Sequence, residues 1–400
     1  MRYPTTLVLS SCLLAVTTLP VAADPIVNCG VRSLADAVEH AQGTNPVITF
    51  SGVCGPIVIT KDGVTLQGVS TAVIDGGGQQ DAVTVAGASR VTLAGIDVRN
   101  GVNGIVAVNG AHLSIFDVSV HQNSATGITL QTGSSAVLAD VTISANRVHG
   151  LDVRSGSAAT ISGTEQANTT LTAEGNGVFG INVNAGSFTL SNATVTATGN
   201  ALGVQIATGG NAFINDVRSV IRATGNRATG LTVVSGAQLV SFGGSIIASG
   251  NVVGVTVNSK AGVDLDAATL LESFNNTSDG LRIQQDSVMT VFNTPTNTGQ
   301  MGLSTINTHH NGGDGVRVLT GSTLTLVNQA RVLSDHNTMN GFVADNGAGV
   351  VLVNSVITDN AIDVRLTFGA RADLQTLTFG SYSCDPTVLV RGTSGIVCPH

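Results

Sequence analysis

The sequence predicts an all-β solenoid, in which the chain winds into coils that stack along one axis. A short phrase, Gly-φ-x-φ with φ mostly aliphatic, recurs at intervals of 23 to 35 residues. Repeats of this length are typical of solenoids, because a single coil buries little apolar surface until its neighbours cover it. The phrase begins at Gly104, Gly127, Gly150, Gly180, Gly203, Gly230, Gly254, Gly280, Gly315 and Gly341, and a degenerate copy covers 363–366.

Each repeat unit contains three short strands. The first is the phrase itself, as in Gly127-Ile128-Thr129-Leu130, where apolar and polar residues alternate with the period of a half-buried strand. A second alternating run follows Gly-Ala or Gly-Ser, as in 321–326, and a third short strand closes the coil. Coils stacked about 4.8 Å apart would place each aliphatic side chain on its equivalent in the next coil.

An asparagine stands three or four residues before most of the phrase glycines. Asparagine tolerates a left-handed backbone and forms local hydrogen bonds, so we expect a tight turn whose stacked amides form a ladder. A column of sugar-binding amides is the less favoured interpretation. The residues are Asn100, Asn123, Asn146, Asn176, Asn200, Asn226, Asn251, Asn276, Asn311, Asn337 and Asn360.

The N-terminal part reads as an export signal followed by a cap. Residues 1–23 combine Arg2, an apolar stretch and a small-residue cleavage site, which predicts a signal peptide and a secreted or periplasmic protein. A lipoprotein signal at Cys12 is the less favoured alternative. Residues 24–56 are expected to cap the open end of the solenoid with a helix over 33–41, for which Ser33 is the N-cap.

Composition argues against several classes of partner. The formal net charge is −8, and Lys61 and Lys260 are the two lysines of the chain, which argues against nucleic acid or an anionic membrane surface as the partner. No stretch after residue 23 is long and apolar enough to span a bilayer. The sequence does not indicate an oligomeric state.

Four cysteines remain after the signal peptide, in one pair near each end of the chain. Export makes disulfides plausible, and the pairs Cys29 with Cys54 and Cys384 with Cys398 would staple the two ends of the solenoid. Three connectivities are open on sequence alone.

The helix, the run Val64-Thr65-Leu66-Gln67-Gly68 and the repeated Asn-x-x-x-Gly-φ-x-φ together resemble right-handed parallel β-helix proteins of the pectin-lyase-like superfamily. The resemblance implies a right-handed parallel β-helix over 57–400, of roughly 11–13 coils, with a C-terminal end closed by a disulfide. It also implies a polysaccharide partner, often acidic, bound along a groove parallel to the helix axis. The motifs of polygalacturonases, pectate lyases and mannuronan epimerases are missing, so their specific activities are not implied.

The repeat register brings together polar residues from the last coils. It places His310, His336 and Asp359 in one column, and His309 and Asp335 in the adjacent one. A histidine beside a carboxylate titrates near neutrality and can transfer protons. We therefore expect an acid/base patch in which His310 or His336 takes a proton and Asp335 or Asp359 orients the imidazole.

Arginines lie just beyond the same turn. Arg282, Arg317 and Arg365 occupy the outward position two residues after the start of the phrase, and Asp314 precedes Gly315. Arg317 would hold a substrate carboxylate in a bidentate pair, with Arg282, Arg365, His309 and Asp314 as further substrate-binding residues.

Several alternatives stay open. The same residues are also what an ordinary solvent-exposed turn would contain, with ion pairs of little energetic consequence. A metal site at the histidines is less favoured, and so is calcium, so no cofactor is expected. Two long coils, around Glu165 to Glu174 and around Pro295 to Met301, predict protrusions, the second as a wall beside the histidines. The function classes are a lyase, hydrolase or epimerase acting on an acidic glycan, a noncatalytic surface adhesin, and a structural β-helix.

Overall fold

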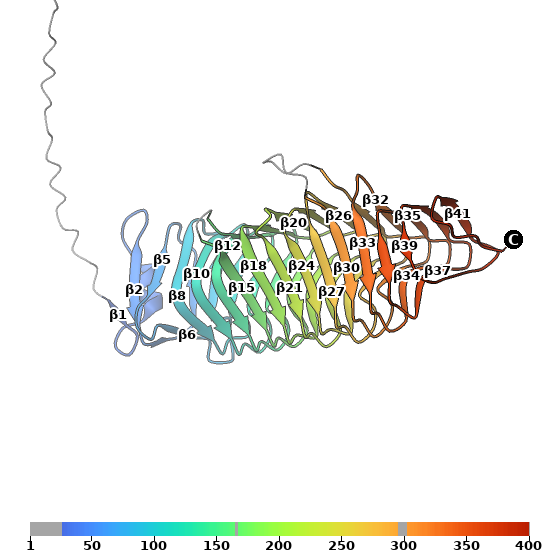
Figure 1. Ribbon diagram of the computed structural model, residues 1–400. Helices are drawn as coiled ribbons and strands as arrows, with labels where there is room; N and C mark the ends of the chain where they lie inside the picture. The colour runs from blue at the N-terminus through green and yellow to red at the C-terminus, as the bar shows by residue number, and fades with distance from the viewer. Residues whose placement is uncertain (1–25, 165–166, 295–301, 400) are drawn as a thin grey trace, which may run out of the picture.

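The computed structural model describes residues 26–164, 167–294 and 302–399. Figure 1 shows one elongated solenoid in which successive coils follow one another along the axis from the N-terminal to the C-terminal end. The predicted signal peptide, Glu165 and the segment from Pro295 to Met301 lie outside the described residues. All strand pairs that the structure describes are parallel, as expected for stacked coils, for example β11 with β13 and β10 with β12.

The strands form three faces. The phrase strands make up a 14-stranded parallel sheet, which we name the first face. Its strands are β4 (Ile57–Ile59), β7 (Val83–Ala86), β9 (Ile105–Val108), β11 (Ile128–Leu130), β13 (Leu151–Arg154), β16 (Phe179–Asn184), β19 (Leu202–Ala207), β22 (Thr229–Val234), β25 (Val253–Asn258), β28 (Leu281–Ile283), β31 (Val316–Val318), β34 (Asn340–Ala344), β37 (Ile362–Leu366) and β40 (Tyr382–Cys384).

A 27-stranded sheet supplies the second and third faces, which follow the first face in each coil. The long strands β8 (Val91–Arg99), β10 (His112–His121) and β12 (Ser135–Ser144) run through both faces. The other strands of the second face are β1 (Val27–Asn28), β2 (Val47–Ser51), β5 (Thr65–Gly68), β14 (Ala158–Ser162), β17 (Ser187–Ser191), β20 (Asn211–Asn215), β23 (Gln238–Phe242), β26 (Gly262–Asp266), β29 (Val288–Val291), β32 (Thr323–Leu326), β35 (Gly349–Val353), β38 (Arg371–Gln375) and β41 (Leu389–Gly392). Those of the third face are β3 (Val53–Cys54), β6 (Val73–Asp75), β15 (Thr169–Glu174), β18 (Ala193–Thr198), β21 (Val220–Thr224), β24 (Ser245–Ser249), β27 (Leu270–Phe274), β30 (Thr305–His309), β33 (Arg331–Asp335), β36 (Val356–Thr358) and β39 (Thr378–Phe379).

The predicted fold class is confirmed, but the number of coils was underestimated. The first face has 14 strands, against the expected 11–13. The strands β4, β7 and β40 lack the phrase glycine, which is why the count of phrases missed them. Their inward residues still stack on those of the neighbouring coil, as Ile57 does on Val83.

The core is a narrow column of aliphatic side chains along the axis. In β11 the inward residues Ile128 and Leu130 are fully buried, and they align with Ile105 in β9 and Leu151 in β13. Each coil therefore covers the apolar side chains of the coil before it. This nearest-neighbour burial is what stabilises a solenoid.

A buried asparagine ladder joins the turns between the third and first faces. The backbone N–H and the Nδ2 of each asparagine donate to Oδ1 of the next, as from Asn226 to Asn251 at 2.9 and 3.0 Å. The ladder runs from Asn123 to Asn360 and ends on Asp363, whose Oδ1 accepts from Asn360 Nδ2 at 3.1 Å. Asn100 was misassigned to it, because Gly101 takes the equivalent place and donates to Asn123, while Asn100 has a φ of 54°.

The ladder explains the phrase glycine. A Cβ added at Gly230 would lie 2.7 Å from both Asn251 Nδ2 and the carbonyl oxygen of Gly254. Real Cβ atoms do not approach other atoms so closely. Glycine is therefore required by the close approach of the ladder amide and the next coil, and no left-handed φ is involved.

Both ends of the solenoid are closed by local features. Helix α1 (Leu34–Glu39) begins at Ser33, whose Oγ accepts from the backbone N–H of Asp36, and it buries Leu34, Ala37 and Val38. Disulfides join Cys29 to Cys54 and Cys384 to Cys398, as the sequence predicted. Within the described residues, no helix has the length and apolar character needed to cross a membrane.

Replacing Asn226 with alanine tests the ladder. The substitution removes the side-chain bonds to Asn251, to the carbonyl of Ala197 and from Asn200 Nδ2, and it leaves the buried backbone N–H of Asn200 without its acceptor. Each unpaired buried group costs about 1–3 kcal/mol, so we expect the free energy of unfolding to fall by roughly 3 kcal/mol or more. Denaturant unfolding measures the change.

Asn211→Ala is the matched control, because Asn211 is exposed and its side chain makes one long bond to the carbonyl of Gly209. We expect it to change stability by less than about 0.5 kcal/mol. Equal effects of the two variants would contradict a stabilising role for the ladder.

Candidate functional site

The predicted histidine columns exist on the third face. His309 in β30 aligns with Phe274 in β27 and Asp335 in β33. The rings of Phe274 and His309 stack with centroids 5.0 Å apart, and those of His310 and His336 stack at 5.1 Å. Figure 1 shows β27, β30 and β33 side by side on one face of the solenoid.

Carboxylates flank the histidines. His336 Nδ1 lies 3.3 Å from Asp335 Oδ2, and His309 Nε2 lies 3.6 Å from Glu272 Oε1. His309 and His310 face each other through their Nδ1 atoms at 3.0 Å. The arrangement is that of an imidazole oriented by a carboxylate, which can accept or donate a proton.

The histidine patch is open to solvent. The side chains of His336 and Asp335 are 55% and 45% exposed, and Asp359 is exposed at the end of its column. His310, His336 and Asp359 also have left-handed backbones with φ between 52° and 60°, a conformation that suits histidine and aspartate better than most residues. The patch is therefore a surface feature, accessible to a large ligand.

The predicted arginines lie on the first face. Arg282, Arg317 and Arg365 align in one column, with Val343 between the last two. Arg282 Nη2 lies 2.7 Å from Asp279 Oδ2, and Arg317 Nε lies 3.6 Å from Asp314 Oδ2. Arg365 is exposed.

Asp314 occupies a buried position beneath Arg317. Its side chain is 5% exposed, and Asp314 Oδ1 accepts hydrogen bonds from the backbone N–H and the Nδ2 of Asn340. Asp279 accepts from the backbone N–H of Asp314 in the same way. Asp314 therefore stabilises the turn and positions Arg317. It would act on a substrate indirectly, by orienting that arginine.

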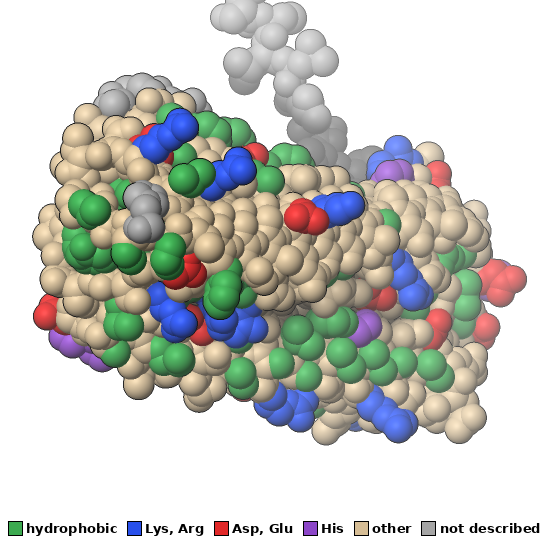
Figure 2. All heavy atoms as spheres, turned by 90° about the vertical axis from the view of Figure 1, so that its right-hand side faces the viewer, with side chains coloured by type: hydrophobic (Ala, Val, Ile, Leu, Met, Phe, Trp, Pro, Cys, Tyr) green, Lys and Arg blue, Asp and Glu red, His purple; other side chains and the backbone are tan. Residues whose placement is uncertain are grey.

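The structure does not bring all the predicted residues into one cluster. The histidines lie at the C-terminal ends of third-face strands, and the arginines lie on the first face. The buried asparagines of the ladder lie between them. Figure 2, which looks at the C-terminal end, shows basic side chains in small separate groups, some of them beside carboxylates, without one large basic area.

A second polar group on the first face was not predicted from the sequence. Asp152 in β13 faces outward, yet its side chain is 6% exposed. Asn182 Nδ2 in β16 donates to Asp152 Oδ1 at 2.9 Å, and Arg154 Nε lies 3.6 Å from Asp152 Oδ2. His149 is half-buried, and its ring stacks on Phe179 with centroids 5.0 Å apart.

The signal for this group was present in the phrase register. His149, Asp152 and Arg154 take the same outward positions relative to Gly150 that Asp279, Arg282 and Gln284 take relative to Gly280. The sequence analysis considered these outward positions only in the C-terminal coils and not in the coil that begins at Gly150. What the sequence does not show is the burial of Asp152.

Burial lowers the pKa of His149 below its ordinary value of 6.5, because desolvation disfavours the charged imidazole. The negative charge of Asp152 acts in the opposite direction, and Arg154 adds to the lowering. His149 is therefore a neutral imidazole near pH 7.

The described residues contain no group of three or more His, Cys, Asp or Glu side chains placed to hold a metal ion. The residues considered for metal, His309, His310, His336 and Asp335, lie close together but do not form such a group.

Comparison with known proteins identifies the architecture. Residues 49–219 match the model of the family described as right handed beta helix region. The described chain has the fold of a right-handed parallel β-helix. This confirms the fold that the resemblance implied.

A comparison with curated protein sequences finds no match. Among solved structures, a double mutant of the periplasmic alginate epimerase AlgG is 10% identical, with a TM-score of 0.40, and 90% of this chain and 84% of that chain are covered. The A-module of mannuronan C-5 epimerase AlgE4 from Azotobacter vinelandii is 11% identical, with a TM-score of 0.37 and coverage of 92% and 93%. Pectate lyase Pel9A is 13% identical, with a TM-score of 0.25 and coverage of 89% and 72%. Such likenesses leave the function to be argued from the site.

His149→Gln tests the environment of this imidazole. Between the lowered pKa of the folded state and 6.5, the unfolded chain binds a proton that the folded chain does not, so the free energy of unfolding falls as pH drops below about 6.5. The variant lacks this titration, so we expect its stability to fall less than that of the wild type between pH 7 and pH 5. Denaturant unfolding across this range measures both slopes, and identical slopes would contradict the burial of His149.

Proposed function

We propose that the protein is exported and binds an acidic polysaccharide, with a proton-transferring patch on its C-terminal coils. The observation that carries the proposal is the column of arginines on the first face. Arg282 and Arg317 are adjacent in the stack, and Arg365 follows two coils later. Successive positions are about 4.8 Å apart, so the column presents positive groups along a line parallel to the helix axis.

The arginines keep donors for a ligand. A guanidinium has five N–H groups, and Asp279 engages the Nε and Nη2 nitrogens of Arg282. The remaining N–H groups suit a carboxylate of a uronate unit, because arginine binds carboxylates in a planar, bidentate geometry. The buried aspartates hold each side chain at its base, which limits the conformational entropy lost on binding.

The histidine patch lies across the ladder from the arginines. In a lyase or epimerase, His336 would accept the proton and Asp335 would orient its imidazole, in keeping with their 3.3 Å contact. His310 stacks on His336 and offers a second imidazole. The product assay described below distinguishes a lyase, a hydrolase and an epimerase.

Noncatalytic binding is the second candidate function. It is favoured by the exposure of His336 and Asp335, since acid/base groups of enzymes are usually withdrawn from bulk water. A surface adhesin would use the same arginine column and would not need the histidines.

Export is supported by the two disulfides, because disulfides persist in oxidising compartments such as the periplasm and the extracellular space. The proposed location is therefore periplasmic or secreted, in keeping with the predicted signal peptide.

Binding of oligogalacturonate and oligoalginate to the purified mature protein tests the proposal. We expect both to bind more tightly than neutral oligosaccharides of the same length, and Arg317→Gln or Arg365→Gln to weaken binding by about tenfold through loss of a charge-assisted contact. Calorimetric titration measures the affinities. Arg222→Gln is the control, because Arg222 is exposed on the third face. Equal affinity for neutral and acidic chains, or an equal effect of Arg222→Gln, would contradict the proposal.

Product formation separates the two candidate functions. The same substrates are followed by the absorbance of unsaturated uronates, by reducing ends and by epimer content. A catalytic protein forms product, and His336→Ala abolishes it while cooperative unfolding is retained. Binding without product from the wild type would establish the noncatalytic alternative.

A further inference from the structure

The first face collects buried polar atoms that have no hydrogen-bond partner. Eight such side-chain atoms occur among the described residues, and five of them belong to residues in or beside first-face strands. They are His149 Nδ1, Asn182 Oδ1, Thr232 Oγ1, Arg317 Nε and Asp345 Oδ1. An unpaired buried polar atom costs about 1–3 kcal/mol, so a concentration of them on one surface points to a ligand that supplies the partners.

The group around β13 and β16 differs from the group around Asp314 and Asn340 on the same face. At the buried Asp314, Oδ1 accepts from both the backbone N–H and the Nδ2 of Asn340, and Asn340 has no unpaired buried atom. At β13 and β16 the hydrogen bonding is incomplete. Asn182 Nδ2 donates to Asp152, but no group donates to Asn182 Oδ1. Asn182 is 6% exposed, which makes it an unpaired, nearly buried acceptor in an outward position.

We infer that Asp152, Asn182, Arg154 and His149 form a binding site for the hydroxyl groups of an uncharged sugar unit. The inference rests on the proposed function, since the ligand is a glycan chain lying along the same face. Asp152 and Asn182 offer carboxylate and amide oxygens that accept from sugar hydroxyls, and His149 offers a neutral ring nitrogen. Arg154 lies 3.6 Å from Asp152 and gives its Nε and Nη2 to Gln131, so the group has no excess positive charge to attract a uronate. Its acceptors suit the hydroxyl groups of an uncharged unit.

Arg154 and Phe179 shape the site. Arg154 lies across the coils and donates to Gln131 Oε1 through Nε at 3.1 Å and Nη2 at 2.7 Å. Phe179 stacks on His149, which fixes the imidazole plane and adds an apolar ring beside the polar groups. A sugar presents hydroxyl edges and apolar ring faces, and this combination of side chains matches both.

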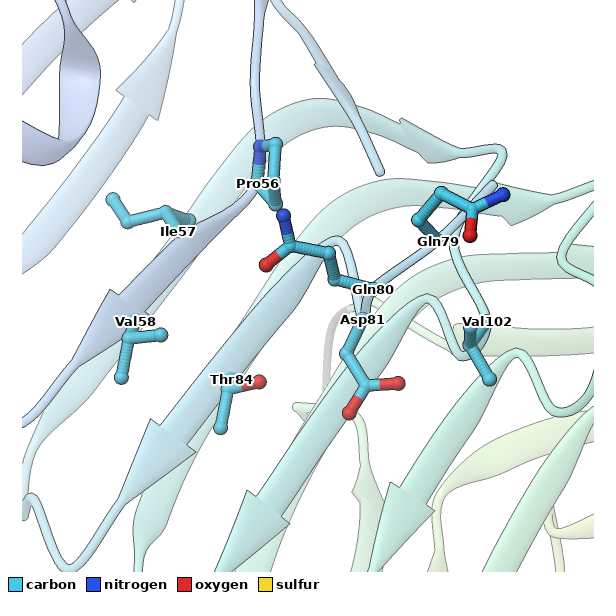
Figure 3. A pocket seen from close by; sticks show the side chains of 8 residues that line it. All are labelled: Pro56, Ile57, Val58, Gln79, Gln80, Asp81, Thr84 and Val102. Atoms are coloured by element: carbon cyan, nitrogen blue, oxygen red, sulfur yellow. The ribbon is translucent and has the colours of Figure 1, made fainter. Parts of the chain in front are cut away.

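A surface hollow lies further along the first face, toward the N-terminal end. It has a volume of about 370 Å³ and is lined by Val58 and Thr84 from neighbouring strands and by Gln79, Gln80 and Asp81 from the preceding loop. Figure 3 shows these side chains around the hollow. Thr84, Val106, Thr129 and Asp152 follow one another in register, so the hollow lies three strand spacings, about 14 Å, from Asp152.

The arginine column lies on the other side of the site. Asp152, Asn182, Gln205, Thr232, Thr256 and Arg282 follow one another on successive strands, which places Arg282 about 24 Å from Asp152. An extended glycan on this face would thus pass from the amide side chains of the hollow, over the uncharged-sugar site, to the arginine column.

Titration of the wild type and Asp152→Asn with cellohexaose, mannohexaose and oligogalacturonate tests the inference. We expect at least one neutral oligosaccharide to bind, with an affinity that falls about tenfold in Asp152→Asn and is unchanged in Asp264→Asn, the same change on β26 of the second face. We also expect the imidazole NMR signals of His149 in the wild type to shift on addition of that oligosaccharide. This second readout does not depend on the folding of any variant.

The outcomes separate the two proposals. If Arg317→Gln weakens binding of oligogalacturonate but Asp152→Asn changes no affinity and the His149 signals stay in place, the inference is overturned and the proposed function stands. If a neutral oligosaccharide binds through Asp152 and oligogalacturonate binds no more tightly, the uncharged-sugar site stands and the acidic ligand is overturned. Absence of binding by every oligosaccharide overturns both.

Discussion

The structure depends on the buried asparagine ladder and on the glycines that make room for it. Each ladder asparagine satisfies the backbone and side-chain N–H groups of the preceding coil, and a Cβ on the phrase glycine would collide with its amide. The turn between the third and first faces therefore keeps the same path in coil after coil. Because that path is fixed, the strands on either side of it stay in register along the axis.

Register is what gives the surface its functional potential. Residues separated by a whole coil in the sequence become neighbours about 4.8 Å apart. The arginines of β28 and β31 therefore lie side by side, and so do the histidines that directly follow β30 and β33. Outward positions carry little of the core packing. They are free to vary in chemistry from one coil to the next.

Much of the fold was predictable because each repeat is encoded by a short, local sequence pattern. The phrase predicted the strands and the histidine columns, and the end-to-end distribution of Cys29, Cys54, Cys384 and Cys398 favoured the disulfides that are found. The assignment of Asn100 failed because Asn100 and Gly101 both suit a turn and the pattern does not choose between them. The burial of Asp152 and Asp314 was beyond the sequence, since it depends on side chains from neighbouring coils.

The first face, with its arginine column and its buried polar groups, is the surface on which we propose that a glycan lies. Hydrogen exchange followed by mass spectrometry, with and without a saturating oligosaccharide that calorimetry shows to bind, tests this proposal most directly. We expect added protection to be concentrated in the turns beside first-face strands, around 147–149, 177–179 and 312–315. Protection concentrated on the second face, with these turns unchanged, would contradict it.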